Sequence, residues 1–270
     1  IFSASSSARN SRRTSILSSA MPPKRRAAAS KSTKQSKRSR DEQGNTELNA
    51  GKGLAVGVSA LWSDGELVVD GRMTQEGFAK LCNKLGVDEL SFEAFYFTYM
   101  LCPTVDDISV VCCSKTALLR SLEALGCQNV TDLPTRLRSK RESLQQHYNT
   151  TEFGPFWRWL FDVGRAISAL NIDAPPGAVR SVPLAEGLLF TEALLSTWPL
   201  LPKLKTFCET MHKQPFTKDL WLQLGRFVHL TSIGVISLDL RGYDDNEAGG
   251  GTAWPCMIDD FVEWCQSNAA

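Results

Sequence analysis

The sequence has 270 residues, 43% of them hydrophobic, which is enough for one large hydrophobic core or two modest ones. A net charge of +1 hides an asymmetry: residues 1–40 hold eleven Lys or Arg and no acid, leaving nineteen bases against twenty-nine acids elsewhere. A basic tail and an acidic body are expected to bind different partners. No run of 18 or more apolar residues is present, so no membrane span is predicted.

The first 50 residues are predicted to be a disordered basic tail, because they combine low hydrophobicity, abundant Ser and dense like charge. Residues 1–20 superficially resemble a transit peptide, but Met21 is a more natural start, so we interpret them as upstream translation or a fragment artefact. Two basic clusters, ten residues apart, are typical of a bipartite nuclear localisation signal and predict a protein of nucleus and cytoplasm. A solvated tail or a weak nucleic-acid arm is the equal alternative. The clusters are Lys24, Arg25, Arg26, Lys37 and Arg38.

Helical patterns begin at about residue 55. Residues 73–86 have apolar side chains at i, i+3, i+4 and i+7 from Phe78, and Gly86 is the predicted C-cap. Residues 91–102 are apolar nearly all round and predict a buried helix, and Ser114 is the predicted N-cap of the next one. Further helices are predicted at 130–148, 151–167, 182–195, 199–212, 217–230 and 257–265.

These patterns predict an all-α fold of two helical lobes, the first EF-hand-like but without calcium loops. The predicted divisions are a tail at 1–50, the EF-hand-like lobe at 51–130 and a C-terminal lobe at 131–270. Residues 65–69 and 107–111 are predicted to pair as short strands, as between the loops of a paired EF-hand. Neither stretch has the D-x-D-x-D-G spacing followed by Glu that a calcium loop requires.

No motif for catalysis or metal binding is recognisable. The histidines His147, His212 and His229 are scattered, with no second ligand at helical spacing. No P-loop and no G-x-S-x-G motif occurs. The eight cysteines lack C-x-x-C spacing, which favours buried free thiols in a reducing compartment, and core packing is favoured over a nucleophile at Cys112 and Cys113.

Two adjacent aspartates interrupt the apolar pattern of the last helix. On a helical wheel, the apolar side chains fall within an arc of about 120°, and Asp259, Asp260 and Glu263 occupy about 100° on the other side. The apolar set is Met257, Ile258, Phe261, Trp264 and Cys265. Adjacent carboxylates diverge by about 100°, which is poor geometry for paired acid–base catalysis. An acidic docking face and a solvated polar side remain, and periodicity alone favours the second.

Residues 215–228 and 243–264 resemble a known family signature. The elements are a Lys-Asp-x-Trp helix start with Thr217 as the predicted N-cap, a Tyr-Asp loop, and Ala-Trp-Pro-x-x-Ile-Asp-Asp-Phe-Val-Glu-Trp. They resemble the C-terminal signature of the defective-in-cullin-neddylation (Dcn-like) proteins, whose shared module is the potentiating-neddylation domain. The resemblance covers about residues 58–267 and is strongest after 180.

The resemblance implies a non-catalytic, ligase-type scaffold that binds a cullin and the N-acetylated neddylation conjugating enzyme within a cullin-RING ligase complex. Such a factor promotes transfer of the ubiquitin-like modifier by proximity, and needs neither a nucleophile nor a cofactor or metal. Nucleic acid and membranes are not expected partners. An EF-hand-like adaptor unrelated to cullins is the alternative function, and an enzyme with a Cys nucleophile is a third.

Family roles carry over to two sets of residues. The implied cullin-binding patch consists of Asp219, Ala253 and Asp259, although Asp219 could instead serve only the helix dipole. The implied pocket for the acetylated N-terminal Met of the conjugating enzyme consists of Phe78, Phe95, Phe97, Val110, Cys113, Val163 and Phe190, for which ordinary core packing is the alternative. The chain departs from the family in a longer 102–110 region, an insertion at 171–180 and a longer loop before Ala253.

Overall fold

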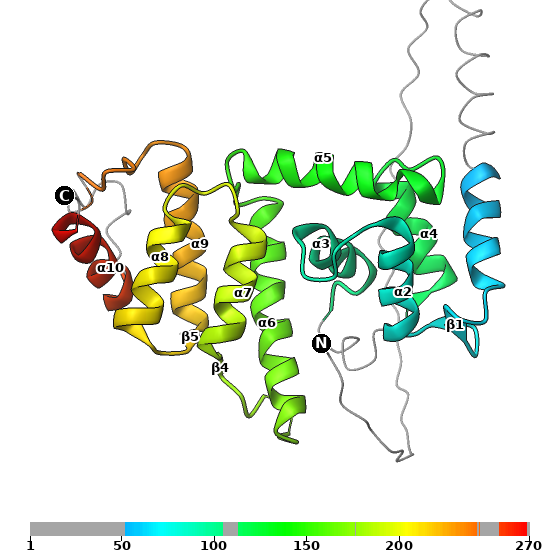
Figure 1. Cartoon of the computed structure of the whole chain (residues 1–270), viewed down its shortest axis with the longest axis horizontal. Coiled ribbons are helices and arrows are strands. Elements are labelled where there is room, and N and C mark those ends of the chain that lie inside the picture. The colour runs from blue at the N-terminus through cyan, green and yellow to red at the C-terminus, as the bar shows by residue number, and fades with distance from the viewer. Residues whose placement is uncertain (1–51, 105–112, 176, 242, 244–253, 269–270) are drawn as a thin grey trace, which may run out of the picture. The chain divides into compact units, whose positions relative to one another are not determined.

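A computed structural model describes residues 52–104, 113–175, 177–241, 243 and 254–268 (Figure 1). All of them belong to one compact unit that spans residues 50–270. Several predicted site residues lie outside the described residues, and their assignments stay predictions. They are Lys24, Arg25, Arg26, Lys37, Arg38, Val110 and Ala253.

The chain is mostly helical, which confirms the predicted all-α class. The first part contains a helix at 52–62, α2 (Gln75–Leu85), α3 (Phe92–Leu101) and α4 (Lys115–Ala124). The second contains α5 (Leu133–Gln145), α6 (Phe153–Asn171), α7 (Leu184–Leu194), α8 (Leu201–Phe207), α9 (Lys218–Ser232) and α10 (Cys256–Ser267). Short turns add a 3-10 segment, η2 (Val130–Asp132), and a π-helical segment, η3 (Cys208–His212). Among the helices described, none is long and apolar enough to cross a membrane.

Sequence signals for helix ends are confirmed where the structure describes them. Gly86 ends α2 in the left-handed conformation at φ 68°, which glycine adopts without steric cost. The Ser114 side chain accepts a hydrogen bond from the Ala117 amide at the start of α4. Thr217 likewise caps α9, with its hydroxyl oxygen 3.2 Å from the Leu220 amide nitrogen.

The first sheet contains one of the two predicted strands. Its antiparallel order is β1 (Val68–Val69), β2 (Arg72–Met73) and β3 (Cys113–Ser114), so β1 pairs with β2, a pairing that the sequence did not predict. The reason is local: Asp70 and Gly71 have φ of 51° and 73°, and two such residues make the tight turn of a hairpin. Residues 107–111 themselves lie outside the described part of the chain. The EF-hand likeness therefore stays a prediction.

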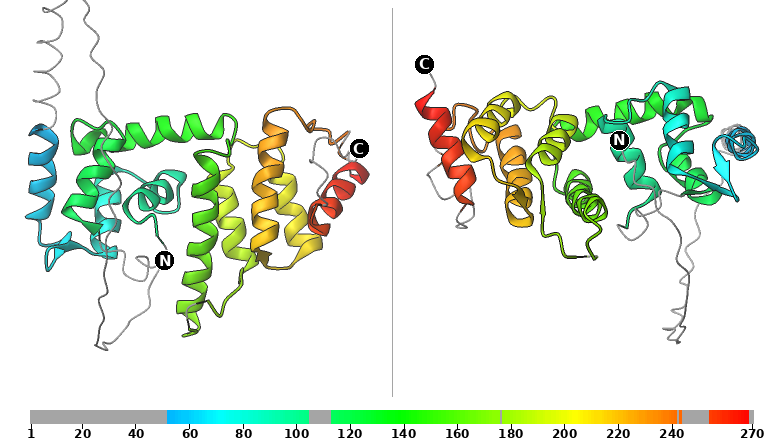
Figure 2. Two further views of the ribbon diagram at one scale, coloured as in Figure 1. Left: turned by 180° about the vertical axis from the view of Figure 1, so that it is seen from behind. Right: turned by 60° about the horizontal axis from the view of Figure 1, so that its bottom comes forward.

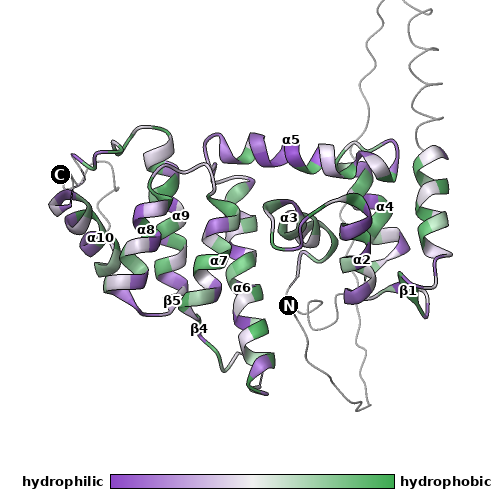
Figure 3. Cartoon of the chain, viewed as in Figure 1, coloured by the Kyte–Doolittle hydropathy of each residue, from purple (hydrophilic) through white to green (hydrophobic). Residues whose placement is uncertain are grey.

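A second, two-stranded sheet joins β4 (Ser181–Val182) to β5 (Phe216–Thr217), with Val182 opposite Phe216. It holds the start of α9 beside the segment that leads into α7. Figures 1 and 2 show α6 to α9 side by side, with α10, drawn in red, next to α8. In Figure 3, α5 is coloured largely as hydrophilic, in keeping with its alternation of buried Leu with exposed basic residues.

A pair of tryptophans fixes α6 against α9 in the core. The rings of Trp157 and Trp221 stack with centroids 4.1 Å apart. Each indole Nε1 donates to the other residue's carbonyl oxygen, at 2.7 and 2.8 Å. A Cβ at Gly225 would lie only 2.6 Å from the Trp157 Nε1, so this close approach requires glycine. Trp221 belongs to the Lys-Asp-x-Trp motif, and its burial anchors the helix that presents Asp219.

Candidate functional site

The apolar face of α10 is confirmed, with one addition. Its predicted apolar residues are buried, except for Trp264, which is half-buried. Val262 is buried as well, so the apolar arc is wider than the wheel predicted. Phe261 lies against Phe207 and Phe227, with ring centroids 5.6 and 6.3 Å apart. The helix therefore packs on both α8 and α9.

Of the three acidic residues on α10, two behave as predicted and one does not. Asp260 and Glu263 are exposed, but Asp259 is half-buried. The Tyr243 hydroxyl donates a hydrogen bond to Asp259 Oδ1 at 2.6 Å. A helical wheel describes one helix alone and could not place a residue that lies sixteen positions earlier in the chain over this carboxylate.

Tyr243 is part of a three-ring contact that we call the aromatic platform (Phe227, Tyr243 and Trp254). Tyr243 and Trp254 are stacked with centroids 6.0 Å apart. The Phe227 ring of α9 lies nearly perpendicular to both rings, with centroids 6.1 and 5.9 Å away. The Arg226 guanidinium lies 5.5 Å from the Trp254 ring centroid, a cation–π geometry. The family signature contains this Tyr and Trp, but sequence reasoning gave them no role.

Asp219 is exposed in the first turn of α9. It precedes Arg226 by seven residues, so the two side chains differ by about 20° around the helix and by about 10 Å along it. Asp219 is thus on the same face of α9 as Arg226, two turns before it. Arg226 contacts Trp254, which stacks on Tyr243, and Tyr243 is hydrogen-bonded to Asp259. Ala253, the third residue of the predicted patch, immediately precedes Trp254 and lies outside the described residues.

Neither aspartate forms an ion pair within the described part of the chain. Lys218, the neighbour of Asp219, is directed to Asp162 of α6 at 3.6 Å. Both carboxylates can therefore accept a cation from another molecule. Charges at such a surface mainly speed the association with an oppositely charged partner and fix its orientation, and they add less to the binding affinity.

The predicted conjugating-enzyme pocket falls into two groups in the structure. Phe95 and Phe97 differ by about 200° around α3 and so face opposite sides. Phe97 packs on the half-buried Phe78 of α2, at 5.6 Å between centroids. Phe95 packs edge-on against Phe190 of α7, at 5.5 Å.

The other two described pocket residues are buried. Cys113 lies in β3 opposite Met73, and Val163 lies in α6 beside Gly164, where a Cβ would come within 2.8 Å of the Phe190 ring. Close packing of this kind is expected if these residues are ordinary core residues. The binding pocket therefore stays a prediction.

Sequence reasoning missed a further aromatic stripe on α3. Phe92, Tyr96 and Tyr99 follow i, i+4 and i+7 spacing, a signal that was present in the sequence, and they meet Phe156 and Trp159 of α6. Burial raises the pKa of Tyr96 to about 12 because it disfavours the charged phenolate. Tyr99 is only half-buried, which makes it an accessible member of this stripe.

The described cysteines are free thiols, and all are buried except Cys256. Burial raises the pKa of Cys82 and of Cys208 to about 12, so both remain thiols at neutral pH. Cys112 lies outside the described residues. Within the described ranges, no group of three or more His, Cys, Asp or Glu is placed to hold a metal ion.

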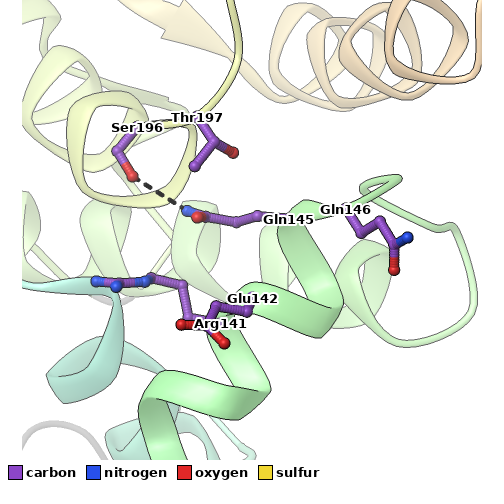
Figure 4. A pocket seen from close by; sticks show the side chains of 6 residues that line it. All are labelled: Arg141, Glu142, Gln145, Gln146, Ser196 and Thr197. Atoms are coloured by element: carbon purple, nitrogen blue, oxygen red, sulfur yellow. Dashed lines mark hydrogen bonds between the residues drawn. The ribbon is translucent and has the colours of Figure 1, made fainter.

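A polar groove of about 540 Å³ lies between the end of α5 and the segment after α7 (Figure 4). Its lining residues are Arg141, Glu142, Gln145, Gln146, Ser196 and Thr197. The buried Gln145 amide donates to the Leu194 carbonyl at 2.8 Å and to the Ser196 hydroxyl at 3.3 Å, and so ties α5 to this segment. The groove includes none of the residues predicted to bind a partner.

Comparison with known proteins agrees with the motif analysis. Residues 133–264 match the family model described as "Cullin binding". The chain is similar to DCN1-like protein 2 of Dictyostelium discoideum, 25% identical over 193 residues, which is 72% of this chain and 63% of the relative. DCN1-like protein 4 of Danio rerio is 28% identical over 190 residues, 70% of this chain and 58% of the relative. Human DCN1-like protein 5 is 27% identical over 195 residues, 70% of this chain and 69% of the relative.

The matched region spans less than two thirds of the length of the first two of these relatives. Even so, residues 133–264 contain α9, Trp254 and most of α10, and this segment is similar to cullin-binding domains. The resemblance of the chain to the defective-in-cullin-neddylation (Dcn-like) family is thereby confirmed.

Proposed function

We propose that this protein is a cullin-binding cofactor of neddylation, which acts as a non-covalent scaffold and not as an enzyme. The observation that carries the proposal is the match of residues 133–264 to cullin-binding domains, since that segment contains both Asp219 and Asp259. Relatives over most of the helical body are named DCN1-like proteins. The cullin would bind to the α9–α10 surface that joins the two aspartates, with Ala253 between them in the sequence.

Charge supports a basic partner at this surface. The chain after residue 40 has ten more acidic than basic residues, and long-range attraction accelerates the encounter with a basic face. Exposed Asp219 and Asp260 contribute to this field, and Asp259 contributes from a half-buried position.

The scaffold role also requires a second partner, the neddylation conjugating enzyme. We propose that its acetylated N-terminal segment binds in the lobe formed by residues 51–130 as an amphipathic segment with an apolar anchor. The half-buried Phe78 supports this site, because it is the most accessible described member of the predicted pocket. Holding both partners converts a bimolecular encounter into an effectively intramolecular one.

A reconstituted cullin-neddylation assay tests the proposal. The wild-type protein is expected to accelerate modifier transfer and to bind the cullin in titration calorimetry. Asp259→Asn is expected to reduce both, whereas Glu263→Gln, a change of the same charge on the exposed face of the same helix, should leave both close to wild type. An unchanged transfer rate with the wild-type protein present would rule out the proposed function.

A further inference from the structure

We propose that Tyr243 is a positioning residue for cullin recognition: it fixes the Asp259 carboxylate in one orientation, with Oδ1 engaged internally and Oδ2 left for the partner. This inference deepens the proposed function and rests on it. It concerns a residue whose side chain belongs to the loop before α10 and not to either helix of the predicted patch.

Tyr243 and Asp259 are joined by a short hydrogen bond. A phenolic O–H donating to a carboxylate at 2.6 Å is a charge-assisted bond, shorter and stronger than a bond between neutral groups. It involves only Oδ1. Within the described residues Oδ2 accepts no hydrogen bond and Asp259 forms no ion pair, although the residue is half-exposed. One oxygen is therefore held and the other remains able to accept from a basic side chain.

Packing around Tyr243 restricts the movement of its side chain. Tyr243 is only 8% exposed. Its ring stacks on Trp254 and lies nearly perpendicular to Phe227, so two contacts of different direction restrict it. Aromatic pairs of this geometry add to the stabilisation that burial provides. The hydroxyl is consequently presented to Asp259 from a fixed point.

The aromatic platform also connects Asp259 to the helix that carries Asp219. Phe227 of the platform and Arg226, which contacts Trp254, are neighbours on α9, and Asp219 lies on the Arg226 face of the same helix. The orientation of Asp259 on α10 is therefore set by α9 through the aromatic platform. The two carboxylates, which come from different helices, are therefore held in a fixed position relative to each other. A partner that contacts both then binds with a smaller loss of conformational entropy.

A double-mutant cycle tests this role with the full chain and a purified cullin. Tyr243→Phe removes the hydroxyl but keeps the ring, and Asp259→Asn removes the charge at constant shape. We expect Tyr243→Phe to weaken cullin affinity about ten-fold, as loss of a hydrogen bond to a charged group does. In the Asp259→Asn background the same change should have little further effect, because there is no carboxylate left to position.

The outcomes are distinguishable. If Tyr243→Phe lowers cullin affinity by the same factor in both backgrounds, the tyrosine acts only through general stability and the positioning role is overturned. If Asp259→Asn abolishes binding while Tyr243→Phe binds like wild type, the cullin surface stands and the positioning role falls. If the wild-type chain does not bind the cullin, the proposed function fails and this inference fails with it. Melting temperatures of all four proteins show whether each is folded.

Discussion

Replacing Asp259 with Lys should cost the protein both stability and cullin affinity. The substitution removes the acceptor of the Tyr243 hydroxyl bond at 2.6 Å. Hydrogen bonds to charged groups contribute about 1.5–3 kcal/mol, and the half-exposed position of Asp259 places the loss near the lower end of that range. For a folded body of this size, about 1.5 kcal/mol corresponds to a fall of roughly 3–6 °C in Tm.

Periodicity alone places Asp259 outside the apolar arc and would predict an unchanged Tm. Cullin affinity should fall further than stability, because an attraction is lost and a repulsion is gained at the proposed contact. Calorimetric titration with a cullin at two salt concentrations, together with thermal melting, measures both effects. Affinity of the wild-type protein should decrease as ionic strength rises, since exposed charges are screened.

Glu263→Lys is the matched control, because it makes the same charge change on the same helix at an exposed side chain. It should change stability by no more than about 0.5 kcal/mol. Equal Tm values for Asp259→Lys and Glu263→Lys would refute the role assigned to the Tyr243 bond. Unchanged cullin affinity in folded Asp259→Lys would reduce these aspartates to a solvated helix face.

Three further predictions address other parts of the chain. Phe190→Ala should destabilise the fold by about 3–5 kcal/mol in denaturant unfolding, because it leaves a cavity at a packed position. Phe78 is half-buried, so Phe78→Ala should cost less stability but weaken binding of the conjugating enzyme's N-terminal peptide. A peptide that binds both variants like wild type would contradict the pocket. At neutral pH, Cys256 should be alkylated faster than Cys82, since Cys82 is buried and its pKa is raised to about 12; equal rates by mass spectrometry would contradict the packing. A fluorescent reporter fused to residues 21–50 should accumulate in the nucleus, and a uniformly cytoplasmic signal would remove the proposed localisation signal.

Local features of this protein could be derived from sequence because they depend on neighbours in the chain. Gly86 ends α2 because glycine adopts positive φ freely, and Ser114 and Thr217 cap their helices with side chains that reach amides three residues on. The buried face of α10 followed from a period of 3.6 residues. The Lys-Asp-x-Trp and Ala-Trp-Pro motifs were sufficient to identify the family resemblance that the comparisons confirmed.

Tertiary structure decided what sequence spacing leaves open. Phe95 and Phe97 are two residues apart and share one predicted pocket, yet α3 directs them to Phe190 and to Phe78 on opposite sides. Asp259 is predicted to face solvent when its helix is considered alone, but Tyr243 of the preceding loop donates a hydrogen bond to one of its carboxylate oxygens. In both cases the deciding contact joins segments far apart in the chain, and the direction in which packed helices and loops present their side chains is set by the core that they share.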